Sequence, residues 1–196
     1  PTKILAQATP IRSSWKTPGS NLDVMKPILV GLLWLGLMLG AAPAAIAKTP
    51  GEIEVGAVLP DALMKGLSGP SRKLSEFRGK PLVINVWASW CAPCRAEMAS
   101  LERLSRVKGG EQFTVIGIST DDYPERAKGF LAKEKTSFSH FIDSKLVLEN
   151  MLGADRLPLT VLVSPQGKVL AKYYGGEEWD SPRALMLVAR NFNIKL

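Results

Sequence analysis

The chain has 196 residues, and 46% of them are hydrophobic, which is enough for at least one domain with a proper core. Its formal net charge is +7; residues 1–47 hold four basic side chains and one acidic one, so residues 48–196 carry the remaining +4. That charge is spread along the chain without a basic run interleaved with aromatics, which excludes a nucleic-acid-binding protein. Two cysteines, Cys91 and Cys94, and one histidine, His140, are too few for a structural zinc site with four ligands.

Two N-terminal segments precede the part of the chain that has the pattern of a folded domain. Residues 1–24 are polar and irregular, so we expect an upstream extension without a packed core. Residues 27–47 carry no charge, follow Met25 and Lys26, and end in an A-x-A sequence typical of a signal-peptide cleavage site. As a helix this segment would be about 31 Å long, just enough to span a bilayer.

Residues 25–47 are therefore predicted to be either a cleaved signal peptide or a membrane anchor. Both alternatives place residues 48–196 outside the cytoplasm, in a periplasm, or in a thylakoid lumen if residues 1–24 are a leader ahead of the signal. Disulfides form in such compartments, so a redox-active cysteine pair would find disulfides to act on there.

Residues 48–196 are predicted to form one domain, and its first elements lead to the cysteine pair. We expect an extended entry over residues 52–63 and a short helical turn over residues 74–78. Residues 82–87 are almost entirely apolar, which predicts a strand buried on both faces. Residues 95–104 place apolar side chains three positions apart, which predicts an amphipathic helix.

Cys91 and Cys94 lie between this strand and this helix, at the spacing of a thioredoxin-type Cys-x-x-Cys redox pair. Cys91 falls at the helix N-terminus, where unpaired N–H groups and the helix dipole favour an anion. Such a position lowers the pKa of a cysteine, and the thiolate is the attacking species. We therefore predict that Cys91 attacks a partner disulfide and that Cys94, one turn further in, resolves the mixed disulfide.

Other uses of the pair are weighed against this prediction. A permanently closed structural disulfide occurs in secreted proteins, although so short a loop would constrain the unfolded chain little. Haem attachment requires a histidine after the second cysteine, and Arg95 stands there instead. A copper chaperone that uses Cys91 and Cys94 as soft ligands is a third alternative.

The rest of the domain alternates strand and helix patterns before a closing hairpin and a last helix. The predicted strands are residues 113–120 and 138–142, the helices are 124–135 and 145–152, and the hairpin joins 159–164 to 169–174. Ser181 caps the last helix, which begins at Pro182 and runs to Phe192. This order predicts an α/β fold of the thioredoxin type with an inserted strand–helix unit in residues 113–152.

Four ring-bearing side chains have distinct expected places. Trp87 is predicted to lie in the core, and Trp90 is predicted to flank Cys91 and offer a flat surface to partners. Trp179 is expected to pack within a loop, and His140 is expected to be a partly buried strand residue.

Residues 79–97, which include Trp-Cys-Ala-Pro-Cys, resemble the TlpA/ResA group of thioredoxin-fold thiol–disulfide reductases. The resemblance extends from about residue 55 to the C-terminus. Residues 157–160 match the place where the group keeps a cis-proline before a strand, and residues 164–169 match its following hairpin turn. Residues 178–182 are more similar to TlpA-type members than to ResA or CcmG.

The resemblance gives Cys91 and Cys94 a catalytic role and adds Glu97, which stands where ResA-like proteins have a glutamate that helps proton movement at the thiols. Glu97 is one helical turn past Cys94, within carboxylate reach, and a solvated helix glutamate is the alternative. Asn85 stands where cytoplasmic thioredoxins carry a buried aspartate. No cofactor and no metal are implied.

The resemblance also implies a substrate-binding set. Its members are expected to be Trp90, Pro93, Leu157 and Pro158. Pro158 would lie opposite Cys91, with a cis bond that exposes the Leu157 backbone to an incoming substrate strand. An ordinary trans proline at the start of a strand is the alternative.

The resemblance implies an extracytoplasmic thiol–disulfide oxidoreductase that reduces partner proteins. Substrates in the group include the haem-binding cysteines of apocytochrome c and the copper-site cysteines of oxidase assembly, and the electrons would come from a membrane donor of the CcdA or DsbD type. A thiol peroxidase of the peroxiredoxin kind is a further alternative. Peroxiredoxins place their reactive cysteine in a Thr-x-x-Cys context, whereas this chain has Ser89-Trp90-Cys91 preceded by Ala88.

Overall fold

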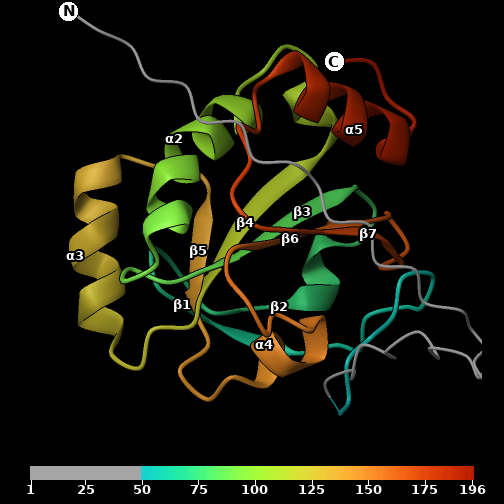
Figure 1. Ribbon diagram of the computed structural model, residues 1–196. Coiled ribbons are helices and arrows are strands. Elements are labelled where there is room, and N and C mark those ends of the chain that lie inside the picture. The colour runs from blue at the N-terminus through green and yellow to red at the C-terminus, as the bar shows by residue number, and fades with distance from the viewer. Residues whose placement is uncertain (1–49) are drawn as a thin grey trace, which may run out of the picture. The chain divides into compact units, whose positions relative to one another are not determined.

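In the part of the chain that the structure describes, seven strands form one mixed sheet in the order β2-β1-β5-β4-β3-β6-β7 (Figure 1). The strands are β1 (Leu63–Gly66), β2 (Arg72–Lys73), β3 (Leu82–Trp87), β4 (Thr114–Ser119), β5 (Ser139–Ile142), β6 (Leu159–Val163) and β7 (Val169–Tyr174). The central strand β3 pairs parallel with β4 and antiparallel with β6, and β4 pairs parallel with β5. All six residues of β3 are buried, as an apolar strand covered on both faces requires.

The computed structural model describes residues 50–196. The extension predicted in residues 1–24 and the signal or anchor predicted in residues 25–47 lie outside the described residues. Within residues 50–196, no helix is long and apolar enough to cross a membrane.

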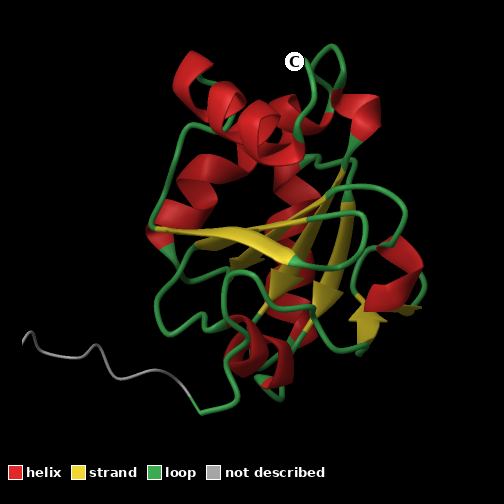
Figure 2. Cartoon of the chain, turned by 90° about the vertical axis from the view of Figure 1, so that its right-hand side faces the viewer, coloured by secondary structure: helices red, strands yellow, loops and turns green. Residues whose placement is uncertain are grey.

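Helices cover both faces of the sheet (Figures 1 and 2). They are α2 (Ala92–Ser105), α3 (Pro124–Glu134), α4 (Val147–Leu152) and α5 (Pro182–Phe192), with the short 3-10 helices η1 (Leu74–Phe77) and η2 (Gly110–Gln112). Side chains of α2, α3 and α5 form a core with one face, whereas α4 and η1 pack on the other. Alternate residues of the central strands point into these two cores, because successive side chains of a strand face opposite sides.

The helix α2 begins at the cysteine pair and is fixed to the sheet by its apolar side. Met98, Leu101 and Leu104, which the sequence places on one face, are completely buried. The helix begins directly after Cys91, so Cys91 is its N-cap residue and Cys94 lies in its first turn.

The structure differs from the expected elements mainly before β3. Residues 52–63 form no long strand; an isolated bridge joins Val58 to Lys168, and β1 begins at Leu63. β1 and β2 pair with each other, and β1 adds to the sheet against β5. Further along, residues 113–152, where the inserted strand–helix unit was expected, hold β4, α3, β5 and α4.

Candidate active site

The two cysteines form a disulfide at the N-terminal end of α2. Cys91 is the N-cap residue, and its Sγ accepts a hydrogen bond from the N–H of Cys94 at 3.2 Å. Pro93 lies in the first turn, where a missing N–H costs nothing and the fixed φ suits the helix. The sulfur of Cys91 therefore sits at the positive end of the helix dipole, which favours its thiolate once the disulfide is reduced.

Access from outside distinguishes the two sulfurs. Cys91 is 5% exposed and lines a surface groove, whereas Cys94 is 0% exposed and does not line it. A partner disulfide can therefore approach Cys91 and not Cys94. This arrangement supports the predicted order, in which Cys91 attacks and Cys94 resolves.

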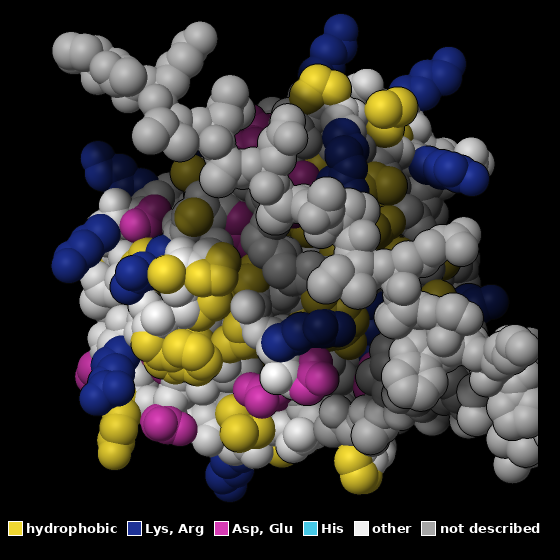
Figure 3. Space-filling view, in the orientation of Figure 1, with side chains coloured by type: hydrophobic (Ala, Val, Ile, Leu, Met, Phe, Trp, Pro, Cys, Tyr) yellow, Lys and Arg dark blue, Asp and Glu magenta, His cyan; other side chains and the backbone are white. Residues whose placement is uncertain are grey.

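The groove has a volume of about 600 Å³ and brings together three of the four predicted substrate-contact residues, Trp90, Pro93 and Leu157. Trp90 is 64% exposed, as expected for a flat surface beside the reactive sulfur. The fourth, Pro158, is buried next to Leu157. Figure 3 shows hydrophobic side chains gathered on this face between α3 and α4, with acidic side chains at its lower edge.

The bond between Leu157 and Pro158 is cis, as the resemblance implied. The C=O of Pro158 accepts a hydrogen bond from the N–H of Gly175 at 2.9 Å. Within the described residues, neither the N–H nor the C=O of Leu157 makes a hydrogen bond. The Leu157 backbone is therefore free to pair with an extended segment lying in the groove.

Asp121 fixes the turn that leads into Cys91, a contact that the sequence reasoning missed. Its carboxylate, 1% exposed, accepts bonds from the N–H of Ser89 at 2.9 Å and from the Ser89 hydroxyl at 2.6 Å. The hydroxyl of Ser119 donates to the same carboxylate at 2.8 Å. Arg95 donates to the C=O of Ser89 at 3.3 Å. The backbone just before Trp90 and Cys91 is thus held from both sides.

Glu97 is buried rather than on a solvated helix face, with 3% of its surface exposed. Asn85, on β3, donates from Nδ2 to Oε1 of Glu97 at 2.7 Å and to Oγ1 of Thr160 at 3.1 Å. The other carboxylate oxygen, Oε2, accepts hydrogen bonds from the N–H of Glu177 at 3.1 Å and from Nε1 of Trp179 at 3.2 Å. Asn85, which the resemblance places where thioredoxins carry a buried aspartate, is therefore a hydrogen-bond donor to this glutamate.

Burial raises the pKa of Glu97 from 4.5 to about 7, because the ionised form loses its hydration. The donors from Asn85, Glu177 and Trp179 oppose that rise, and the negative charge of Glu177 adds to it. A shallow pocket of about 260 Å³, lined by Glu97 with Pro93, Gly176 and Glu177 among others, connects this carboxyl group to the surface. Glu97 can therefore exchange a proton near neutral pH.

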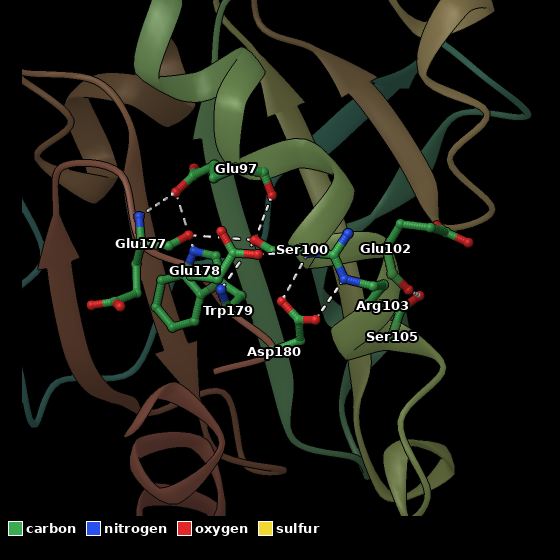
Figure 4. Close-up of polar contacts among 9 residues, drawn as sticks. All are labelled: Glu97, Ser100, Glu102, Arg103, Ser105, Glu177, Glu178, Trp179 and Asp180. Atoms are coloured by element: carbon green, nitrogen blue, oxygen red, sulfur yellow. Dashed lines mark hydrogen bonds and ion pairs between the residues drawn. The ribbon is translucent and has the colours of Figure 1, made fainter. Parts of the chain in front are cut away.

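The segment that holds Glu97 is anchored along α2 by further polar contacts (Figure 4). Ser100 accepts from the N–H of Trp179 at 3.0 Å and donates to the C=O of Glu97 at 2.7 Å. Arg103 pairs with Asp180 at 2.5 Å and with Glu178 at 2.6 Å. Trp179, expected only to pack in a loop, is completely buried and also donates to Glu97. Its indole N–H is the contact that sequence reasoning did not find.

His140 is more deeply buried than expected, at 1% exposed, and is not among the residues that line the groove. Its Nε2 lies 3.0 Å from Oγ1 of Thr136. Burial lowers the pKa of His140 from 6.5 to about 3. The ring is therefore neutral at physiological pH and has a structural place beside Trp87.

The Redoxin family model matches residues 54–186 of the chain. Curated relatives are named thiol–disulfide oxidoreductase ResA. The protein from Halalkalibacterium halodurans is 29% identical over 156 residues, which cover 80% of this chain and 85% of the relative. The one from Geobacillus thermodenitrificans is 27% identical over 117 residues, 60% of this chain and 67% of the relative.

Solved structures agree with these relatives. A putative thiol:disulfide interchange protein DsbE from Chlorobium tepidum superimposes with a TM-score of 0.66 at 25% identity and covers 71% of this chain and 99% of its own. A thiol–disulfide oxidoreductase from Bacteroides fragilis gives a TM-score of 0.55 at 31% identity, and the match covers 62% of this chain and 93% of the Bacteroides chain. The predicted thioredoxin-like fold is confirmed.

Proposed function

Because the chain belongs to the Redoxin family and is a thiol–disulfide oxidoreductase, we propose that it reduces disulfides of partner proteins outside the cytoplasm, in the maturation of cytochrome c or of cytochrome oxidase. The observation that carries the proposal is the Cys91–Cys94 disulfide at a helix N-terminus, opening on a groove where the Leu157 backbone makes no hydrogen bond within the described residues. The names of the ResA relatives support the same class of reaction.

The reaction begins from the reduced pair. The Cys91 thiolate attacks one sulfur of the partner disulfide, a mixed disulfide forms, and the other partner sulfur leaves as a thiolate that takes up a proton. Cys94 then loses its proton and attacks Cys91, which closes the Cys91–Cys94 disulfide and releases the second partner thiol. Two electrons pass from the protein to the partner, and the reactive pair ends in the oxidised state seen here.

Glu97 is proposed as the group that accepts the proton of Cys94. It lies one helical turn from Cys94, inside the domain where water does not reach that thiol. Its pKa of about 7 lets it take the proton during resolution and return it to solvent through the neighbouring pocket. A carboxyl group with an ordinary pKa near 4.5 would hold the proton too weakly to do this at neutral pH.

The groove supplies the binding part of the proposal. An extended partner segment pairs with the free backbone of Leu157 while its cysteine reaches Cys91, and Trp90 covers the neighbouring residues. Residues 25–47 would deliver or anchor the domain outside the cytoplasm, and a membrane donor of the CcdA or DsbD type would reduce the pair again. The proposed substrates are the haem-binding cysteines of apocytochrome c or the copper-site cysteines of an oxidase subunit.

A trapping experiment tests the reaction. The Cys94→Ser variant should hold an oxidised Cys-x-x-Cys peptide as a stable adduct at Cys91, visible by mass spectrometry and released by dithiothreitol. Cys91→Ser is the matched control and should trap little. Equal trapping by both variants would show that the attacking sulfur is wrongly assigned, and no adduct with either would refute the proposed activity. Rapid peroxide consumption without reduction of any peptide would favour the thiol peroxidase instead.

A further inference from the structure

Carboxylates outnumber cations among the residues that line the groove. Asp122, Glu149 and Asp155 line the groove, and Arg156 is the one basic residue among the described residues that line it. The Arg156 guanidinium lies 4.0 Å from the carboxylate of Asp155 and 4.6 Å from the centre of the Tyr174 ring. Because Arg156 is already engaged with Asp155, the groove keeps a negative surplus from Asp122 and Glu149.

A further carboxylate, that of Asp143, adds to the negative charge at Glu149. Asp143 is 6% exposed and accepts bonds from the N–H groups of Val147 and Glu149 at 3.0 and 2.8 Å. Partial burial and the negative charge of Asp143 raise the pKa of Glu149, and a hydrogen bond from Thr120 opposes that rise. A cation placed beside Glu149 would be attracted by the charges of Glu149 and Asp143 together.

The acidic groove contrasts with the rest of the chain. Residues 48–196 carry a net charge of +4, so an average stretch of this surface would be basic. Charges on a protein surface act over about 8 Å at physiological ionic strength, so a partner in the groove responds to the groove and not to the whole-molecule charge. The local sign therefore selects which segments are accepted.

We propose that the groove selects partner segments in which the reacting cysteine is flanked by lysine or arginine. This inference rests on the proposed function and specifies its substrate class. The segment lies against Trp90 and pairs with the Leu157 backbone, and its cationic side chains reach Glu149 on one side and Asp122 and Asp155 at the rim. Asp122 and Asp155 are exposed, so they act mainly on association and its salt dependence, whereas Glu149 is half-buried and acts at closer range.

Three oxidised peptides that share one Cys-x-x-Cys core and differ only in flanking Lys, Gln or Glu residues test this selection. Each is mixed with the fully reduced protein, quenched in acid and separated by chromatography to give a second-order rate constant. At about 100 mM salt, where charges act over about 10 Å, the Lys peptide should be reduced about tenfold faster than the Glu peptide, and at about 500 mM salt the two rates should come within about twofold. The Gln peptide should fall between them.

Substitutions identify the groups responsible. Glu149→Gln and Asp122→Asn should each bring the Lys-to-Glu rate ratio closer to one. The ratio is the quantity to compare, because a lost negative charge also changes the acidity of Cys91 and alters the rates for all peptides together. Glu111→Gln is the control. Glu111 lies past the far end of α2, about 20 Å along the helix from Cys91, and its substitution should leave the ratio unchanged.

The outcomes distinguish the selection by charge from the disulfide reductase activity on which it depends. Reduction of the Gln peptide with equal rates for the Lys and Glu peptides at low salt would overturn the selection by charge and leave the disulfide reductase activity standing. A faster Glu peptide would also overturn it. Failure to reduce any of the three peptides would overturn both the activity and the selection.

Discussion

Replacing Glu97 by glutamine should stabilise the oxidised protein at alkaline pH and not at acid pH. The pKa of Glu97 is raised from 4.5 to about 7, and each pKa unit corresponds to about 1.36 kcal/mol of difference between the two protonation states. The buried carboxylate therefore costs about 3 kcal/mol of the free energy of unfolding when it is ionised. A glutamine at this position keeps the size of the side chain and an oxygen acceptor but has no charge to bury.

The sign of the change in the free energy of unfolding with pH follows from the number of protons that each state binds. Between pH 4.5 and about 7 the native state holds a proton on Glu97 that the unfolded state has lost, so stability falls as the pH rises through this range. Below pH 4.5 the group is neutral in both states and the cost is absent. Above about pH 7 it is ionised in both states and the cost is complete. The free energy of unfolding of Glu97→Gln minus that of the wild type should therefore rise by about 3 kcal/mol from about pH 4 to about pH 8.5.

Urea unfolding of the disulfide-intact proteins, followed by circular dichroism at half-unit pH steps, measures this difference. His140 titrates in both proteins, so its contribution cancels. Glu111→Gln, at an exposed position, serves as the control and should give a difference that does not follow this curve. A difference for Glu97→Gln that stays constant with pH, or whose midpoint lies near pH 4.5, would refute the argument that burial governs this carboxyl group.

Three further predictions use other contacts of the site. Trp179→Phe removes the indole N–H that favours ionised Glu97, so the pH midpoint of the same stability comparison should move upward; an unchanged midpoint would contradict the role given to that bond. Asp121→Asn should lower the free energy of unfolding by about 2 kcal/mol, because the N–H and the hydroxyl of Ser89 lose a charged acceptor. Asp122→Asn, at the exposed neighbouring position, is the control and should change it little in the same urea assay. In the wild type, His140 takes up a proton between pH 6.5 and about 3 only when the protein unfolds, so acid destabilises the fold. His140→Gln should therefore remove about 3 kcal/mol of the difference in the free energy of unfolding between about pH 7 and about pH 4. An equal loss of stability in acid for both proteins would exclude this cause.

Local sequence patterns were sufficient for the elements around the cysteine pair. The apolar run of residues 82–87 predicts a strand with the same bounds as β3, and the hairpin predicted over 159–164 and 169–174 corresponds to β6 and β7. These elements are predictable because each is buried on a face that its own side chains specify. β1 and β2 were missed, because they are short, partly exposed strands that form by pairing with each other and, for β1, with the distant strand β5.

The sequence by itself determined the chemistry of this protein. Two cysteines three positions apart, between an apolar strand and an amphipathic helix, place a thiolate at a helix N-terminus, and this depends only on neighbours in the chain. Only the tertiary structure decided the surroundings of that thiolate. Glu97 meets Trp179 and Ser89 meets Asp121 across 82 and 32 positions of the chain, and the groove draws its acidic groups from separate loops and α4. Desolvation and charge depend on distance in space, so the raised pKa of Glu97 and the sign of the groove exist only once the sheet has brought these segments together.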